Sequence, residues 1–270
     1  MSRQCEVGSE NGLPALSGEP AIPFEPEASG PTAPAMNRPA TRAVLLDAAG
    51  TLFDLARPLG DTYSGLADEF GGNLDPDTLT AGFRSAFADA PPMAFPGRHG
   101  ADLDRAERGW WRTVVERVTR EAGGVPEFDS YFDRLYAHYA SARAWRAFDE
   151  APGVLAALRG RGVGLAVVSN FDSRLPPLLD ALGLAPFFDA VVCSGAVGAA
   201  KPDGAIFAHA LTTLGVDAHE ALHVGDSRVH DYDGARAAGL EALLVDRGTT
   251  TNRTGTIPDL RGILDWLAEA

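Results

Sequence analysis

Short, continuous apolar runs recur along the chain from residue 43 onward. Each is bounded by turn-forming or polar residues, and the five clearest are AVLL (43–46), VGLAVVS (163–169), AVVCS (190–194), ALHVG (221–225) and ALLV (242–245). A continuous apolar run of this length is typical of a strand that is buried on both faces. The pattern therefore predicts five strands in the interior of a parallel sheet.

Helical patterns alternate with these runs. Residues 152–162 begin with a proline and end at glycines, and residues 202–215 do the same. Proline at a helix start and glycine past its end are usual boundaries. Alternating strands and helices imply right-handed crossovers, with helices on both faces of the sheet. The predicted fold class is α/β, a doubly wound parallel sheet.

Residues 60–146 follow a different pattern. They contain several helical stretches, including RAERGWWRTVVERVTREAGG and FDSYFDRLYAHYASARAW, and no convincing strand. We interpret them as a helical cap domain inserted after the first strand. The α/β core is then built from residues 41–59 and 147–270.

The first forty residues are rich in Pro, Gly, Ser and Glu and show no period. Such composition predicts a disordered tail over residues 1–40. Met36 stands just before the first strand, so translation could begin there instead of at Met1. No basic region followed by an apolar stretch is visible, so we expect no secretory signal. Cys5 and Cys193 are too few for a disulfide framework, which favours a cytoplasmic protein.

Charge and length narrow the possible partners. The 270 residues carry a formal net charge of −14 and a pI of about 4.8. An acidic surface disfavours nucleic acid and anionic membranes, and no apolar run reaches membrane-spanning length. A small-molecule partner is therefore expected. The sequence leaves a monomer and a homodimer equally open.

Polar residues stand at four of the predicted strand ends. Ligands of doubly wound sheets bind beyond the carboxyl ends of the strands, so these positions are the first candidates for a functional site. Each alone could be a turn cap or an ordinary loop residue. Their joint occurrence in one order predicts a site formed by Asp47, Thr51, Ser169, Asn170, Lys201, Asp226 and Asp231.

These residue types suit phosphate chemistry. The carboxylates of Asp47 and Asp226 offer the hard oxygen ligands that Mg²⁺ prefers. Lys201 supplies a point charge for phosphate and would keep a carboxylate ionised. The hydroxyls of Thr51 and Ser169, with loop N–H groups, could bind phosphate oxygens. A carboxylate beside a metal ion can attack phosphorus and form an aspartyl-phosphate.

The motifs DxxGT, SN, KP and GDSxxxD, in this order, resemble those of the haloacid dehalogenase superfamily. The resemblance extends from about residue 42 to the end of the chain, and the helical insertion is similar to that superfamily's cap of the first type. The stretches SNFDSRL and GDSRVHDYDGARAAG and the tryptophan pair at 110–111 also resemble the haloacid dehalogenase-like hydrolase domain-containing protein 3 group.

The resemblance implies a role for each strand-end residue. Asp47 becomes the nucleophile, and Asp47, Asp226 and the backbone carbonyl of Ala49 become Mg²⁺ ligands. Asp231 would position the metal ion and the lysine indirectly. The residues implied to bind phosphate are Thr51, Ser169, Asn170 and Lys201, and Lys201 also acts in catalysis.

Ala49 departs from the superfamily's usual phosphatases. They carry a second aspartate at this position, which protonates the leaving alcohol and then activates water. Such general acid–base help is worth roughly a hundredfold to ten-thousandfold in rate. An alanine cannot supply it, although a backbone carbonyl can still bind metal.

Three branches of the superfamily fit poorly. Phosphonate-cleaving members need a cap lysine, and Lys201 is the only lysine of the chain. Dehalogenases lack the Gly-Asp pair that stands here at residues 225–226. Sugar-phosphate mutases depend on the missing acid.

The sequence thus predicts a Mg²⁺-dependent hydrolase of a small phosphorylated metabolite with an altered acid–base step. An acyl phosphate would need little protonation, or His230 or His99 could stand in for the acid. The alternative is a regulatory module that binds phosphate and Mg²⁺ without catalysis. A 2-haloacid dehalogenase ranks behind both.

Overall fold

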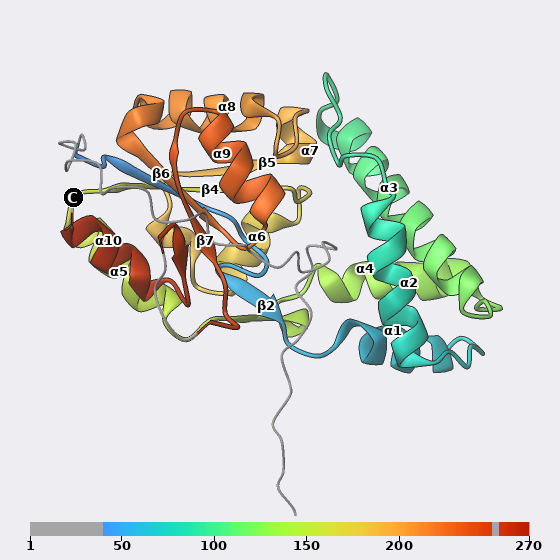
Figure 1. The fold of residues 1–270 in the computed structure, drawn as a ribbon. Helices are drawn as coiled ribbons and strands as arrows, with labels where there is room; N and C mark the ends of the chain where they lie inside the picture. The colour runs from blue at the N-terminus through green and yellow to red at the C-terminus, as the bar shows by residue number, and fades with distance from the viewer. Residues whose placement is uncertain (1–39, 250–253, 270) are drawn as a thin grey trace, which may run out of the picture.

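A computed structural model of the protein describes residues 40–249 and 254–269. Its centre is a six-stranded parallel sheet with the strand order β5-β4-β1-β6-β7-β8 (Figure 1). The strands are β1 (Ala43–Leu46), β4 (Gly164–Ser169), β5 (Ala190–Cys193), β6 (Ala221–Gly225), β7 (Glu241–Val245) and β8 (Thr256–Ile257). The predicted fold class is confirmed, and the five apolar runs match five of the strands to within one residue.

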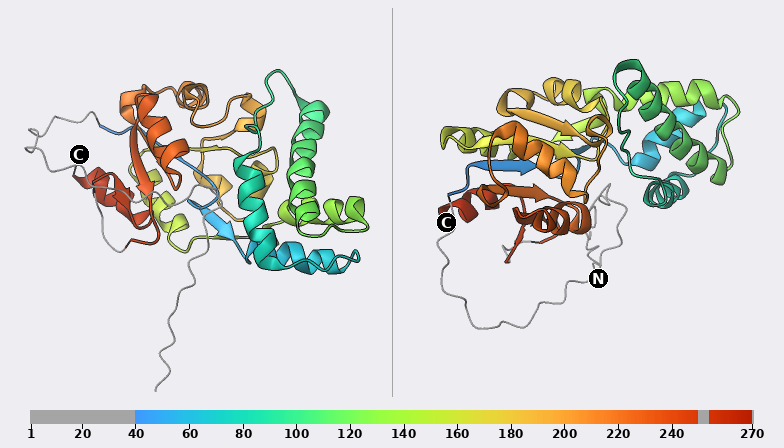
Figure 2. Two further views of the ribbon diagram at one scale, coloured as in Figure 1. Left: turned by 45° about the vertical axis from the view of Figure 1, so that its right-hand side comes forward. Right: turned by 90° about the horizontal axis from the view of Figure 1, so that it is seen from above.

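Alternate residues of the strands face opposite sides of the sheet. In β1, Val44 and Leu46 belong to one buried cluster, and Ala43 and Leu45 belong to the other. The first cluster includes side chains of α5 (Ala151–Gly160), α6 (Leu175–Ala181) and α10 (Arg261–Ala268); the second includes those of α8 (Gly204–Leu214) and α9 (Gly234–Ala237). Figures 1 and 2 show helices on both faces. Burial on both faces explains why the strands read as continuous apolar runs.

Capping residues account for where the helices of the core begin and end. Helix α8 starts after Asp203, whose side chain accepts a hydrogen bond from the backbone N–H of Ala205 at 2.9 Å. It ends at Gly215, which adopts the left-handed conformation that glycine tolerates best. Helices α5 and α8 are the two that proline and glycine positions predicted.

Four helices form a separate layer beside the carboxyl ends of the strands (Figures 1 and 2). They are α1 (Leu59–Asp68), α2 (Pro76–Ala88), α3 (Gly100–Glu121) and α4 (Phe128–Tyr139), called the cap below. A two-stranded antiparallel ribbon of β2 (Phe53–Leu55) and β3 (Trp145–Ala147) stands where the chain enters and leaves the cap. The expectation of no strand within residues 60–146 is wrong at Trp145 and Arg146, because a three-residue strand leaves no readable period. The bounds predicted for the cap stay a prediction.

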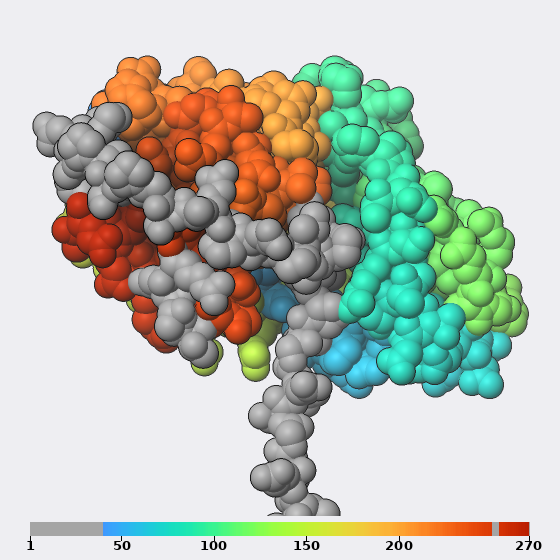
Figure 3. Space-filling model, in the orientation of Figure 1, coloured from blue at the N-terminus to red at the C-terminus, as the bar shows by residue number. Residues whose placement is uncertain are grey.

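Partly buried hydrogen bonds tie the cap to the loop that follows β4. The indole Nε1 of Trp111 on α3 donates to Asp172 Oδ2 at 2.5 Å. The backbone N–H and the hydroxyl of Ser173 each donate to the Glu107 carboxylate at 3.1 Å. Figure 3 shows the cap and core surfaces in direct contact. This loop is therefore shaped by the cap as well as by the sheet.

Some predictions concern residues outside the described ranges. The disordered tail, apart from its last residue, the alternative start at Met36 and the position of Cys5 are among them. Within residues 40–249 and 254–269, no helix combines the length and apolarity that crossing a membrane requires.

Cys193 at the end of β5 offers a test of the packing. Burial, aided by the charges of Asp172 and Glu107, raises the pKa of its thiol to about 12. We expect folded Cys5→Ser protein to react very slowly with iodoacetamide from about pH 7 to about pH 9, because the reactive thiolate is scarce. Urea-unfolded protein, with an ordinary thiol pKa, should react faster as pH rises over the same range. Rapid labelling of the folded protein, followed by mass spectrometry, would contradict this packing.

Candidate active site

Two of the predicted strand-end carboxylates meet at the Lys201 ammonium. Its Nζ lies 2.6 Å from Asp47 Oδ1 and 2.5 Å from Asp231 Oδ1. Asp47 follows β1, Lys201 precedes α8 and Asp231 follows β6. All three are almost completely buried, with exposed fractions of 7%, 4% and 1% respectively. A single buried ammonium therefore bridges two carboxylates from different strand ends.

The buried charges shift one another's pKa values. Burial raises the pKa of Asp47, although Lys201 opposes the shift. Burial also raises the pKa of Asp226 well above its ordinary value, and the charge of Asp47 adds to the effect. Burial acts in the same direction on Asp231, but Lys201 and a hydrogen bond from His223 outweigh it and lower the pKa of that carboxyl. Of the three carboxyls, Asp226 is thus the one whose ionised form its surroundings disfavour most.

The described carboxylates fit a divalent cation. One oxygen from each of Asp47, Asp226 and Asp231 lies within 4.8 Å of the others. When all three carboxyls are ionised, they and the Lys201 ammonium give a net charge of −2 (−3 + 1), which a divalent cation would neutralise. Oxygen ligands of this kind suit Mg²⁺ or Ca²⁺. The set is therefore a candidate metal centre, and Ala49 lines the same cavity.

Asp231 is held more tightly than the other two carboxylates. Besides Lys201, its Oδ2 accepts a hydrogen bond from the backbone N–H of Ser227 at 3.0 Å. A single turn of wide π-type helix, Arg228–Asp233, carries it, and such turns are frequent at functional sites. With its oxygens engaged in this way, Asp231 suits the indirect role that the resemblance implies.

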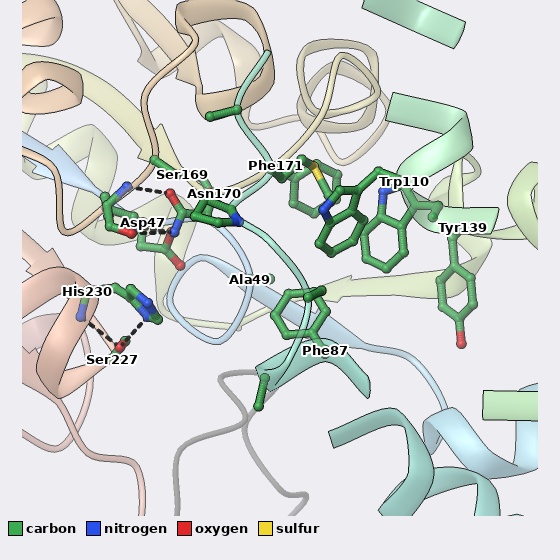
Figure 4. A pocket seen from close by; sticks show the side chains of 18 of the residues that line it. Asp47, Ala49, Phe87, Trp110, Tyr139, Ser169, Asn170, Phe171, Ser227 and His230 are labelled. Carbon is green, nitrogen blue, oxygen red and sulfur yellow. Dashed lines mark hydrogen bonds and ion pairs between the residues drawn. The ribbon is translucent and has the colours of Figure 1, made fainter. Parts of the chain in front are cut away.

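Ser169 ends β4, Asn170 follows it, and both line the cavity. Ser169 is 3% exposed. The amide of Asn170 is engaged with the backbone of Lys201: Nδ2 donates to the Lys201 carbonyl at 2.9 Å, and the Lys201 N–H donates to Oδ1 at 2.7 Å (Figure 4). Asn170 therefore positions the lysine, and its predicted contact with phosphate stays a prediction.

Thr51 lies beneath the loop instead of facing the cavity. It is fully buried and is absent from the described residues that line the cavity. Its hydroxyl has no hydrogen-bond partner within the described part of the chain. Arg247 holds this loop from outside, because its Nη2 donates to the Thr51 carbonyl at 2.9 Å. The predicted phosphate-binding role of Thr51 stays a prediction.

Two glycines allow acidic side chains to approach the backbone closely. Gly50 has φ +84°, and a Cβ there would lie 2.3 Å from Asp226 Oδ2. A Cβ at Gly225 would lie 2.1 Å from Asp231 Cγ. Neither distance is compatible with a real side chain, so the site needs glycine at both positions.

His223 is a site residue that sequence reasoning missed. It is fully buried in β6, and its Nε2 lies 2.9 Å from Asp231 Oδ1. Burial lowers the pKa of His223 despite the pull of Asp231, so a neutral imidazole donates its Nε2–H to the ionised carboxylate. The available signal was a histidine in the middle of an otherwise apolar strand.

The two histidines proposed as substitutes for the missing acid differ in position. His230 lines the cavity, and its Nδ1 lies 3.1 Å from Ser227 Oγ (Figure 4). His99 is exposed, caps the start of α3 and is not among the described lining residues. Of these two, His230 alone shares the cavity with Asp47 and Ala49.

The Gly50 contact can be tested directly. We expect Gly50→Ala to weaken the affinity for Mg²⁺ at least about tenfold, because the new methyl group displaces the Asp226 carboxylate. Gly162→Ala is the matched control: Gly162 has φ +74° with no atom within 4 Å of the built Cβ. It should cost about 1 kcal/mol of stability through backbone strain and leave Mg²⁺ affinity unchanged. If calorimetry gives equal Mg²⁺ affinities for the two variants, Asp226 is not a ligand of the metal ion.

Comparisons with known proteins agree on the family. The family model for haloacid dehalogenase-like hydrolases matches residues 41–239. The chain is 39% identical to haloacid dehalogenase-like hydrolase domain-containing protein 3 from Mus musculus, over 76% of this chain and 81% of that protein. It is 40% identical to phosphoserine phosphatase from Thermus thermophilus, over 56% of this chain and 62% of that protein. It is 33% identical to the plasmid-borne phosphoglycolate phosphatase of Cupriavidus necator, over 76% and 81%.

Solved structures share the fold across different reactions. A phosphatase from Thermococcus onnurineus superposes with a TM-score of 0.58 at 23% identity, covering 84% of this chain and 98% of its own. An L-2-haloacid dehalogenase from Xanthobacter autotrophicus gives 0.63 at 21% identity, covering 85% and 98%. At these identities the likeness establishes the fold alone. With the family model matching most of the chain, this protein belongs to the haloacid dehalogenase-like hydrolase family.

Proposed function

We propose that the protein is a Mg²⁺-dependent phosphohydrolase that acts on a small phosphorylated molecule through an aspartyl-phosphate. The observation that carries the proposal is the Lys201 ammonium held between Asp47 and Asp231, with Asp226 within metal-binding reach. The names of the Thermus and Cupriavidus relatives, both phosphatases, support it.

The proposed reaction has two displacements at phosphorus. A carboxylate oxygen of Asp47 attacks the phosphorus, the bond from phosphorus to the leaving oxygen breaks, and an aspartyl-phosphate forms. Water then attacks the same phosphorus, which releases inorganic phosphate and restores the Asp47 carboxylate. Lys201 and Ser169 stabilise the negative charge on the phosphoryl oxygens. A Mg²⁺ ion held by Asp47, Asp226 and the Ala49 carbonyl would add charge neutralisation when bound.

Ala49 restricts which leaving groups a substrate can carry. No carboxyl group at this position can protonate the leaving oxygen, so the leaving group must depart as a stable anion or be protonated by another group. Acyl and aryl phosphates meet the first condition. His230 could meet the second, since it lines the same cavity. Both routes keep Asp47 as the nucleophile.

Ala49 also favours a second candidate, a module that binds phosphate and Mg²⁺ without turnover. Loss of the acid would leave binding intact, because Asp47, Lys201 and Asp231 are present and buried and Asp226 is present and partly buried. A dehalogenase is the least favoured of the three functions, since attack on carbon would make no use of the metal-binding carboxylates. Activity measurements separate the three.

The proposal predicts phosphate release that requires both the metal and Asp47. Treatment with EDTA should abolish release from phenyl phosphate or acetyl phosphate, and added Mg²⁺ should restore it. Asp47→Asn should lower the rate about a thousandfold or more, because the amide is a poor nucleophile. Circular dichroism would confirm that the variant is folded. If phosphate release does not exceed that of Asp47→Asn, the binding module becomes the favoured function. If chloride is released from 2-chloropropionate, the protein is a dehalogenase.

Restoring the acid should reveal what Ala49 costs. We expect Ala49→Asp to raise kcat for glycerol phosphate, a poor leaving group, by about a hundredfold or more, with a much smaller gain for phenyl phosphate. Ala49→Asn, of nearly the same size but unable to give up a carboxyl proton, is the matched control. An equal gain from both variants would show that shape, and not proton transfer, limits the rate.

A further inference from the structure

The cavity above Asp47 is large and mostly apolar. Its volume is about 890 Å³, which is at the upper end for small-molecule sites. Lys201 and the carboxylates around it lie at one end of the cavity. In Figure 4 the rings of Phe87, Trp110 and Phe171 lie on the other side of Ala49 from Asp47. The cap therefore offers a separate compartment for the leaving group.

Aromatic rings pack against one another along this compartment. Phe87 lies edge-on to Trp110, with ring centroids 5.7 Å apart, and 6.1 Å from Trp111. Trp110 and Trp111 are 4.9 Å apart, also edge-on. Phe83 stacks on Phe87 at 5.4 Å. A further aromatic ring can extend such a cluster favourably.

The polar groups of these rings are already used within the protein. Trp110 Nε1 donates to the Pro91 carbonyl at 2.8 Å, and Trp111 Nε1 donates to Asp172 at 2.5 Å. What the two indoles present to a ligand is therefore apolar ring surface. This surface favours a leaving group that carries no hydrogen-bonding groups of its own.

The arginine of this compartment is neutralised before any ligand arrives. Arg174 lines the cavity, and its Nε and Nη2 donate to the two oxygens of Asp172 at 2.9 and 2.6 Å. Its guanidinium lies 4.0 Å from the centre of the Tyr136 ring, and Asp172 is fully buried. Lys201 is likewise paired with two carboxylates at the other end. Among the described lining residues, no arginine or lysine is left to receive a second anionic group.

We propose that the leaving group is an aromatic ring without a second negative charge, so that the substrate class is an aryl phosphomonoester. This inference rests on the proposed function and specifies its substrate. Carboxylate-bearing phosphate esters are excluded, because their second anion would be desolvated beside aromatic rings without a partner. An aryloxide also departs with less protonation than an alkoxide, so the same class tolerates Ala49.

Two phosphonates that differ in one group test the inference without turnover. Benzylphosphonate and phosphonoacetate each carry a methylene phosphonate, attached to a phenyl ring in the first and to a carboxylate in the second. We expect the Mg²⁺-loaded protein to bind benzylphosphonate at least about tenfold more tightly in calorimetry. Equal affinity, or tighter binding of phosphonoacetate, would overturn the proposal.

A pair of phenylalanine variants locates the effect in the cap. Phe87→Ala should weaken benzylphosphonate binding about three- to tenfold and leave phosphonoacetate unchanged. Phe128→Ala is the matched control, because Phe128 is also a half-buried cap phenylalanine and does not line the cavity. It should change neither affinity. Phe87→Leu keeps an apolar side chain in case the alanine variant fails to fold, and it should show the same direction of change.

Failure of this inference is distinguishable from failure of the proposed function. Inorganic phosphate serves as the probe of the charged end alone. Binding of phosphate and phosphonoacetate without a preference for benzylphosphonate would reject the aryl class and keep the phosphate site. Absence of binding by all three probes would reject both. Aryl preference in binding, without phosphate release from phenyl phosphate, would keep the inferred compartment and reject catalysis.

Discussion

The ion pairs of Lys201 with Asp47 and Asp231 are the constraint on which the rest of the site depends. Removing three charges from water is costly unless each is paired and hydrogen-bonded. Here the cost is offset by short contacts of 2.5 and 2.6 Å and by hydrogen bonds from Ser227 and His223 to Asp231. Because the three residues come from different segments, their pairing also fixes how the strand ends meet.

Burial of the sheet on both faces explains which parts of the fold could be predicted. Strands buried on both faces must be apolar throughout, so β1 and β4 to β7 are visible in the sequence. Residues that break the pattern at their ends stand out for the same reason. The ribbon strands β2 and β3 and the two-residue β8 are too short to impose a period. His223 was missed because a single polar residue inside an apolar strand can be an ordinary buried histidine.

Polar side chains could be located from the sequence, but their partners could not. Asn170 and Thr51 were both expected to face phosphate. In the structure the Asn170 amide bonds to the backbone of Lys201, and Thr51 is buried under its loop. A motif specifies residue type and order, whereas a hydrogen-bond partner depends on how distant segments pack. The aromatic compartment was hidden for the same reason, since its rings come from α2, α3 and the loop after β4.

Ala49 and the aromatic compartment both restrict which leaving group the substrate can carry. A site without a general acid lowers the barrier only for leaving groups that are stable as anions. A compartment lined by rings and paired charges accepts only leaving groups that bring no second charge. An aryl group satisfies both conditions, because delocalisation into the ring stabilises the departing oxygen and the ring itself packs against apolar surface. The missing carboxylate and the apolar cap can thus be two parts of one adaptation to the substrate, not a loss of function beside an unrelated cavity.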